Sequence, residues 1–449
     1  MAKPKGEKRT YVCDEMHAIK DISSLNLRRP VDRGYVVNWD LQKEIWSHVF
    51  SKILKIDPRR CHIVLTEAPF NLPSIAAEQD DVIFNHFGFK SALICNPGVL
   101  ALADRLSRVV DEDEKASDDD KTLKPSALAA RARCGVVLDA GFSFAHATPI
   151  FDDRVLRRGV RRVNLGGKAL TNYLKELVSY RQWNMMDEYV LVDDVKEKTC
   201  YACASAAEEL KKAKVRGPAN EVNREYVLPD GVHVLRGYVK EGPARDPDAE
   251  DGDDSDEDPD DEPGGKKRKR GGKKNGRGGG GGGGGGGTGD GDAAAPNNNR
   301  PRGGGGFVEQ TMTMGNERFM VPEALFHPSD VGLNQAGVAE ATAQAVRATA
   351  PELRGLMFAN VVLAGGCANL PGFRERFVSE LRPLVPAEEA LAVHSDPEPE
   401  LAAWRGGSAI AAEEGALERN AATREEYLAD PAAFARRYEE HRAVVKGRI

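Results

Sequence analysis

The sequence predicts a mixed α/β fold that is interrupted by a long low-complexity insert. Short apolar runs at residues 134–139 and 360–364 end in turn signals and are typical of buried strands. Residues 170–178 carry apolar side chains at helical spacing and follow a pair of glycines. Residues 241–306 are acidic, then basic, then polyglycine. That composition cannot bury enough apolar surface to offset the entropy of ordering, so we expect disorder there.

The first predicted strand is followed by its hairpin partner. Residues 144–150 are the expected second strand, after a turn at Gly141. Further along, residues 225–235 predict a strand, an Asp-Gly turn and another strand. Strands and helices therefore alternate along the chain, as an α/β fold requires.

The strand at residues 360–364 runs into Gly365 and Gly366, and Pro371 opens the next helix. Two further segments are helical by composition, residues 338–350 and residues 408–417.

Charge and glycine content describe the insert more than the folded part. The 449 residues include 63 basic and 70 acidic side chains, for a net charge of −7. Residues 246–277 hold twelve acids and eight bases, so the rest of the chain carries only −3. Of the 46 glycines, 21 lie between Gly264 and Gly306. A nearly neutral folded part disfavours a strongly basic nucleic-acid-binding domain.

Several classes of protein are disfavoured by simple patterns. The sequence has no run of 18 apolar residues, so we expect no transmembrane helix, and its start lacks the apolar stretch of a secretory signal. The seven cysteines are odd in number and favour reduced thiols in a nuclear or cytosolic compartment. Cys200 and Cys203 form a lone CxxC pair, and without a second pair we expect no metal site.

Three short motifs are candidates for ligand contact. Asp139-Ala-Gly141 ends a strand in a turn whose backbone N–H groups suit a phosphate, although such turns are common and a structural turn explains it too. Gly365-Gly366 permits close approach to the backbone, or is a plain packing corner. Lys196-Glu197 is a charged patch on a predicted helix, or only its solvated face. No spacing suggests a nucleophilic set, so we predict no catalytic residue.

A basic run lies inside the insert. It consists of Lys266, Lys267, Arg268, Lys269 and Arg270. The run matches a nuclear import pattern, and contact with histones or nucleic acid and a merely solvated linker remain open alternatives.

Taken in order, the motifs resemble the actin family. They are NWD at 38–40, LTEAPFN at 65–71, LDAG at 138–141, VKEK at 195–198, LPDG at 228–231, GNERF at 315–319, PEALF at 322–326, LAGG at 363–366 and WRGGS at 404–408. The series covers nearly the whole chain outside the insert and the charged loop at 111–127.

Within that family the chain resembles the nuclear actin-related protein 6 class, through residues 163–182, 186–188 and 327–333. The resemblance implies a subunit of remodelling complexes that exchange ordinary histone dimers for those carrying the variant histone 2A.Z. It implies contacts with the remodeller's motor subunit and a small zinc-finger partner, and indirect contact with histones or the nucleosome. It also implies location in the nucleus, with the cytoplasm as a second place, and no membrane partner.

The resemblance further implies an actin-like fold in which two ribonuclease-H-like domains cradle ATP between them. The expected parts are the remainder of the first domain at 11–150 with its charged loop at 111–127, the second domain at 151–400 with the insert at 241–306, and C-terminal helices at 401–449 that return to the first domain. Too few residues precede these motifs for the first phosphate hairpin. We therefore expect the chain to lack the first strands of domain one and to be poorly stable in isolation.

The second phosphate hairpin is only partly matched. Asp139, Gly141 and His146 agree with the family pattern, whereas Phe142 occupies its second acidic position. If Asn96-Pro97 marks the family's helix start, the position that orients water falls near Asp104. An ionised acid there accepts hydrogen bonds but donates none. We therefore expect weak or no ATP turnover.

Contacts to adenosine are better matched. Lys196, Glu197, Gly365 and Gly366 agree with positions that bind it in the family, whereas Glu400 is acidic where actin is basic. ATP or ADP is thus expected, if at all, as a structural ligand. The main hypothesis is a non-catalytic scaffold subunit. The alternatives are an active ATPase or sugar kinase of the same superfamily and a cytoskeletal actin-related protein.

Overall fold

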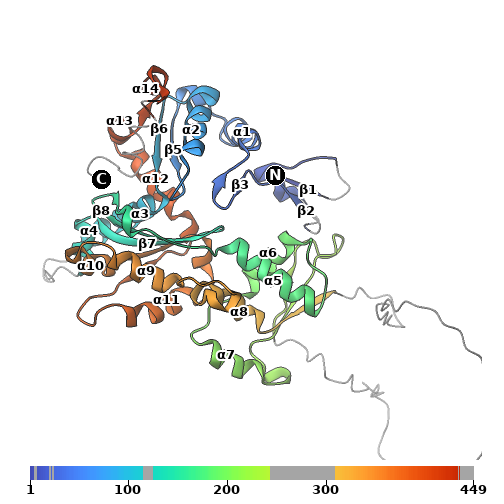
Figure 1. The fold of residues 1–449 in the computed structure, drawn as a ribbon. Helices are drawn as coiled ribbons and strands as arrows, with labels where there is room; N and C mark the ends of the chain where they lie inside the picture. The colour runs from blue at the N-terminus through green and yellow to red at the C-terminus, as the bar shows by residue number, and fades with distance from the viewer. Residues whose placement is uncertain are drawn as a thin grey trace, which may run out of the picture. The chain divides into compact units, whose positions relative to one another are not determined.

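The computed structural model describes residues 1–4, 8–19, 22, 25–114, 125–242, 309–432 and 434. The chain divides into two units, of which Met1–Asp246 with Gln310–Ile449 is the first and Pro247–Glu309 the second. Only Glu309 of the second unit is described, so the fold below is that of the first unit (Figure 1). The basic run 266–270 and almost all of the predicted insert lie outside the described residues.

A six-stranded mixed sheet lies at the centre of this unit. Its strands are β7 (Cys134–Ala140), β8 (Ala145–Phe151), β9 (Arg154–Val155), β10 (Arg161–Val163), β14 (Val361–Ala364) and β15 (Val393–Ser395). The order is β10-β8-β7-β14-β15, with β9 paired to β8. β7 and β8 form the expected hairpin, and β14 pairs parallel to both β7 and β15. The sheet thus joins strands from both sides of the domain boundary predicted at residue 150.

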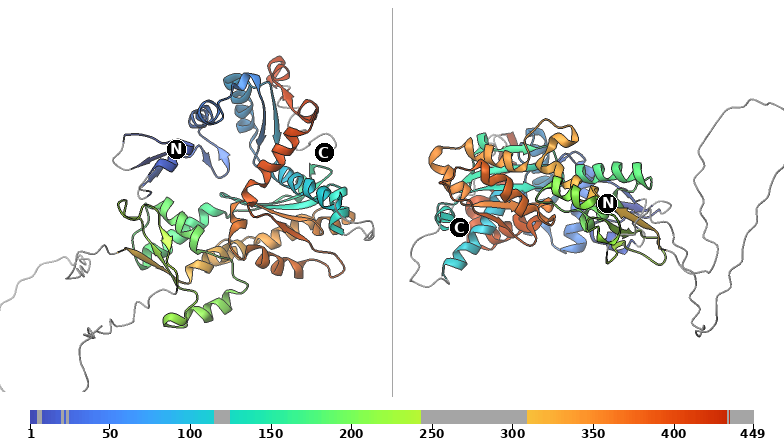
Figure 2. Two further views of the ribbon diagram at one scale, coloured as in Figure 1. Left: turned by 180° about the vertical axis from the view of Figure 1, so that it is seen from behind. Right: turned by 90° about the horizontal axis from the view of Figure 1, so that it is seen from below.

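Side chains of β7 alternate between two cores, as the two-residue period of a strand requires. Val136 and Leu138 pack with helices α9 (Val338–Arg347), α10 (Pro351–Phe358) and α11 (Phe373–Leu381). Val137 packs on the other face with α3 (Pro97–Glu114) and α12 (Ala402–Ala412). Figure 2 shows these two groups of helices on opposite sides of the strands.

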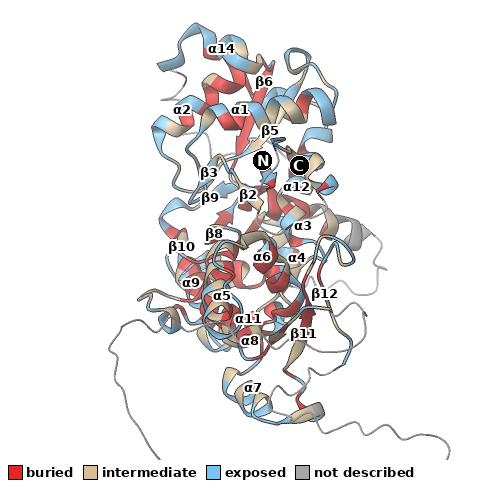
Figure 3. Ribbon diagram, turned by 90° about the vertical axis from the view of Figure 1, so that its right-hand side faces the viewer, coloured by how far each residue is buried: buried red, intermediate tan, exposed pale blue. Residues whose placement is uncertain are grey.

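A second sheet has three strands in the order β16-β6-β5. β5 (His62–Thr66) runs parallel to β6 (Ser91–Cys95), and β16 (Ala422–Thr423) is antiparallel to β6. β6 is buried along its whole length (Figure 3). An aromatic core of Phe50, Phe84, Phe89 and Tyr427 covers this sheet. Helix α12 packs against α3 and β5, so the chain's C-terminal helices contact elements from residues 62–114.

The remaining elements are shorter or peripheral. They are β1 (Ala2–Pro4), β2 (Leu25–Leu27), β3 (Val31–Asp32), β4 (Tyr35–Val36), α1 (Trp39–His48), α2 (Pro73–Asp81), α4 (Pro125–Arg131), α5 (Gly167–Arg181), α6 (Tyr189–Thr199), α7 (Ala206–Ala213), β11 (Arg224–Val227), β12 (Tyr238–Val239), β13 (Thr311–Met314), α8 (Glu317–Phe326), α13 (Ala416–Asn420) and α14 (Arg424–Ala429). β12, β11 and β13 form a separate three-stranded sheet. No helix in the described ranges is both long and apolar enough to cross a membrane.

Two predicted elements differ from the structure for local reasons. The second strand expected up to residue 235 is wrong, because Asp230 Oδ1 accepts the backbone N–H groups of residues 232, 233 and 234 at 2.8–2.9 Å and holds them in a turn. β11 pairs instead with β12 and β13. The helix expected at 408–417 is broken, because Gly415 adopts a left-handed φ of 72° between α12 and α13.

The contact between α12 and α3 gives a stability prediction. A Cβ at Gly406 would lie 1.9 Å from the carbonyl oxygen of Leu100, whereas one at Gly407 would meet no atom closer than 3.5 Å. We expect Gly406→Ala to lower the free energy of unfolding by about 1–3 kcal/mol through overpacking. Gly407→Ala is the matched control and should be neutral or stabilising by up to about 1 kcal/mol. Equal stability of the two variants in urea unfolding would contradict this packing.

Candidate functional site

The β7–β8 turn supports the start of helix α5. The Gly141 N–H closes the turn by donating to the Phe144 carbonyl at 3.0 Å. The N–H groups of Gly167 and Lys168 donate to the carbonyls of Gly141 and Phe142, at 3.1 and 2.8 Å. A Cβ at Gly166, the residue before Gly167, would lie 2.6 Å from the Phe142 oxygen. Glycine is therefore required where the helix meets the turn.

The β7–β14 pairing brings the second glycine turn to the same place. Ala364 lies beside Asp139 in the parallel register, so Gly365 follows directly next to that carboxyl group. Gly365 has a φ of 86°, and a Cβ there would lie 2.6 Å from Asp139 Oδ1. A Cβ at Gly366 would meet no atom within 4 Å. One glycine thus allows close packing and the next borders open space.

Asp139 and His146 are cross-strand partners at the end of the hairpin. Burial raises the pKa of the Asp139 carboxyl group to about 6. Burial, helped by the nearby Arg162 charge, lowers the pKa of His146 to about 4, so its ring is neutral at pH 7. His146 Nε2 is buried and has no hydrogen-bond partner among the described residues. The histidine therefore supplies no positive charge to the site.

Lys196 reaches the site from helix α6, but its ammonium group is already occupied. Nζ donates to Asp193 Oδ1 at 2.6 Å, to Thr171 Oγ1 at 2.8 Å and to the Gly167 carbonyl at 3.5 Å. The side chain is 9% exposed. Three acceptors match the three N–H donors of an ammonium group, and Asp193 balances its charge. We call this arrangement the Lys196 clasp.

The other predicted positions lie at the surface. Glu197 is exposed next to Lys196, and burial of part of its side chain together with the nearby Asp193 raises its pKa. Glu400 Oε2 accepts a hydrogen bond from Asn369 Nδ2 at 2.6 Å, just beyond the Gly366 turn. The site therefore contains more acidic than basic side chains.

Asp104, near the position that orients water in the family, is engaged in ion pairs. Its carboxylate is buried and paired with Arg108 and with Arg405 of α12. Asp104 lies two helical turns beyond Pro97, which places it on the face of α3 that packs against α12. At the start of the same helix, Asn96 Oδ1 accepts the Gly98 N–H at 2.8 Å.

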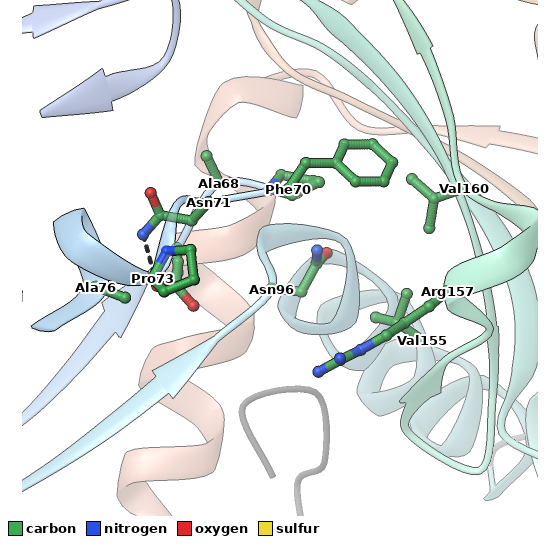
Figure 4. Close-up of a pocket in the computed structure, with 11 residues that line it drawn as sticks. Ala68, Phe70, Asn71, Pro73, Ala76, Asn96, Val155, Arg157 and Val160 are labelled. Carbon is green, nitrogen blue, oxygen red and sulfur yellow. Dashed lines mark hydrogen bonds between the residues drawn. The ribbon is translucent and has the colours of Figure 1, made fainter. Parts of the chain in front are cut away.

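A cavity of about 350 Å³ opens beside Asn96 (Figure 4). Its wall is formed by Glu67, Ala68, Pro69, Phe70, Asn71, Pro73, Ala76, Asn96, Val155, Arg157 and Val160. The Phe70 ring separates it from His146, with ring centroids 6.3 Å apart. The wall is mostly apolar, and Asn71 Nδ2 is engaged with Glu67 Oε1 at 2.7 Å, as the dashed line in Figure 4 marks. Within the described ranges, no group of side chains could hold a metal ion.

The fold and the two glycine turns define an actin-like protein. The family model for actin matches residues 1–438, and the chain belongs to the actin family. It is similar to Actin-related protein 6 of Oryza sativa subsp. indica, with 36% identity over 425 residues, 92% of this chain and 85% of the rice protein. It is also similar to Actin-related protein 6 of Arabidopsis thaliana, with 36% identity over 402 residues, 90% and 82% of the two chains.

A fungal relative extends the comparison. Actin-like protein ARP6 of Cryptococcus neoformans is 32% identical over 441 residues, 97% of this chain and 78% of its own length. The family resemblance and the α/β actin-like fold predicted from the sequence are therefore confirmed.

The actin family suggests a nucleotide, and the described residues fit one only in part. Gly366 borders open space and the turns at Gly141 and Gly365 present backbone, which suits a closely held ligand. The charged groups do not suit phosphates, because Asp139 has no paired cation among the residues that the structure describes and the charge of Lys196 is balanced by Asp193. Sequence patterns missed Asp193, although its position three residues before Lys196 places it on the same helical face.

The pKa of Asp139 gives a prediction with a definite sign. The folded pKa of about 6 lies above the ordinary aspartate pKa of 3.8, so ionisation costs stability as the pH rises through this window. Asp139→Asn should therefore raise the free energy of unfolding by about 1–2 kcal/mol at pH 7.5. At pH 3.8, where the folded Asp139 is protonated, the variant should be little more stable than the unmodified chain. Thermal unfolding at both pH values measures this. Asp187→Asn, at an exposed acid, is the control, and an equal gain from it at pH 7.5 would contradict the argument.

The Lys196 clasp gives a prediction about nucleotide affinity. Asp193→Asn removes the balancing charge 2.6 Å from Nζ but keeps a hydrogen-bond acceptor. We expect ADP to bind about tenfold more tightly to this variant, since removing a negative charge from the site lowers the repulsion of an anionic ligand. Fluorescence titration with a labelled ADP measures the affinity. Asp187→Asn removes the same charge elsewhere and is the control. An equal change of ADP affinity in Asp187→Asn, or no change in Asp193→Asn, would refute the role of the clasp.

Proposed function

We propose that the chain is a non-catalytic actin-related subunit of a nuclear ATP-dependent chromatin-remodelling complex that deposits the variant histone 2A.Z. In this role it is a scaffold between the motor subunit and a small zinc-finger partner, and it meets histones or the nucleosome indirectly. The observation that carries the proposal is the agreement over 92% of the chain with a protein named Actin-related protein 6.

The chemistry of the site supports a non-catalytic role. Hydrolysis requires a positioned water and cations that stabilise the charge developing on phosphate. Here Phe142 replaces an acid, Asp104 is committed to arginines, and the Lys196 ammonium is balanced by Asp193. A nucleotide held at the glycine turns would then act as a structural ligand.

The alternative is an active actin-like ATPase. The partly fitting glycine turns favour it, because they leave room for a nucleotide at Gly366. A phosphate-release assay on the purified full chain with magnesium and ATP distinguishes the two, and turnover comparable to that of filament-forming actin would favour the alternative.

The scaffold proposal predicts specific partners. The tagged full chain should co-purify with a remodeller motor subunit, a small zinc-finger protein and 2A.Z-type histones when the eluate is identified by mass spectrometry. A conventional actin tagged in the same cells is the matched control and separates partners shared by the whole family. Enrichment of tubulin, dynein or components of branched filaments instead would reject the proposal and favour a cytoskeletal protein.

The nuclear location is tested separately by fluorescence microscopy. Replacement of residues 266–270 by glutamines should shift a fluorescently tagged chain toward the cytoplasm if this run is the import signal. Exclusion of the unmodified chain from the nucleus would contradict the proposed compartment.

A further inference from the structure

A second cavity, of about 730 Å³, lies at the end of the three-stranded sheet where β5 and β6 begin. His62, Ser91 and Thr423 lie side by side across the three strands and form its floor. The cavity is at the opposite end of β6 from Asn96, which follows the last residue of that strand. It is therefore separate from the glycine turns and from the cavity of Figure 4.

Three cationic side chains line this cavity, and each comes from a different part of the chain. They are Arg59, Lys90 and Arg424. Arg59 and Lys90 are exposed and Arg424 is half-buried, and none of the three forms an ion pair with a carboxylate of the described residues, in contrast to Arg376, which pairs with Glu323 at 2.6 Å. Unpaired cations that converge on a concave surface repel one another, so an anion in the cavity would be stabilised.

Backbone contacts anchor the segments that carry the cations. A Cβ at Gly88 would lie 3.3 Å from Arg59 Cγ, so the arginine stem packs over this left-handed turn. The Lys90 N–H donates to the Cys61 carbonyl at 3.0 Å, and its carbonyl accepts the Arg424 N–H at 2.9 Å. Arg424 Nε donates to the Phe84 carbonyl at 2.7 Å, which orients the guanidinium group and leaves its terminal nitrogens for a ligand.

Neutral hydrogen-bonding groups complete the wall. His62 Nδ1 and Ser91 Oγ are 2.7 Å apart, which orients the imidazole ring and leaves its second nitrogen free to meet a ligand. Thr423 and Asn85 also line the cavity, but Thr423 Oγ1 donates to Glu426 Oε2 at 3.1 Å and Asn85 Nδ2 donates to Asp81 Oδ1 at 2.6 Å. Cations, an imidazole and hydroxyl groups are the partners that phosphate oxygens use in proteins.

We propose that this cavity binds a small phosphate-bearing molecule. Its volume suits a ligand of drug-like size, and three cations suit more than one phosphate group. Glu418 and Glu425 also line the cavity and disfavour a long polyanion such as duplex DNA, which needs an uninterrupted row of cations. The proposal goes beyond the scaffold role and does not depend on it.

A purely structural explanation exists for part of the cluster. Arg424 lies at the carbonyl end of the helical segment Val82–Phe87, where a cation is stabilising without any ligand. Arg59 and Lys90 have no such backbone acceptor among the described residues. These two are therefore the positions to change, because their loss should affect a ligand far more than the fold.

The test is isothermal titration of the full chain with inorganic tripolyphosphate. We expect a single class of sites here, and Arg59→Gln and Lys90→Gln should each weaken binding by about fivefold or more, the effect of losing a charge-assisted hydrogen bond. Lys214→Gln, which removes an exposed lysine from the end of α7, is the matched control and should leave binding unchanged. Thermal unfolding of each variant confirms that the fold is retained.

Three outcomes would overturn the proposal. The first is no binding of tripolyphosphate by the unmodified chain. The second is binding that persists in the double variant of Arg59 and Lys90, which would place the anion elsewhere, for example at the glycine turns. The third is competition by duplex DNA: if DNA displaces tripolyphosphate and the same variants no longer bind DNA, the ligand of the cavity is nucleic acid and not a small molecule.

Discussion

The parallel pairing of β7 with β14 is the constraint on which the site depends. These strands are more than 200 residues apart in the chain, yet their register places Ala364 beside Asp139. The turn after β14 then meets the carboxyl group at the end of β7, and the turn after β7 meets the start of α5. A one-residue slip would move every side chain of the strand to the opposite face. The alternating cores around Val136 and Val137 prevent that slip.

This geometry also explains the need for glycine at the site. At Gly166 and Gly365 a neighbouring backbone segment lies so close that a side chain would overlap with it. Packing therefore requires glycine at both positions, whether or not a ligand is bound. Gly366 is different, because nothing in the protein occupies the space beside it. Packing therefore does not explain why residue 366 is a glycine, whereas room for a ligand does.

The sequence predicted the strands at 134–139 and 360–364 and the helix that follows Gly166-Gly167, because apolar runs and glycine turns are local signals. It failed where a side chain competes with the backbone, as Asp230 does, or where one glycine breaks a helix, as Gly415 does. Matching motifs identified Lys196 and Asp139 but not the groups that surround them. Asp193 contacts Lys196 within α6, whereas Thr171 reaches it only because α5 packs against α6.

The two charged regions of the molecule follow opposite rules. At the glycine turns, Lys196 has three acceptors and Asp139 has no cationic partner within the described ranges, so an incoming anion must displace existing interactions. At the start of β5 and β6, one of three cations, Arg424, is oriented by a backbone carbonyl, and all three are without carboxylate partners among the described residues. Binding free energy is gained where charges are preorganised and unpaired, and it is lost where pairs must be broken. Binding an anion should therefore cost less free energy in the second cavity than at the glycine turns, where the actin family suggests a nucleotide.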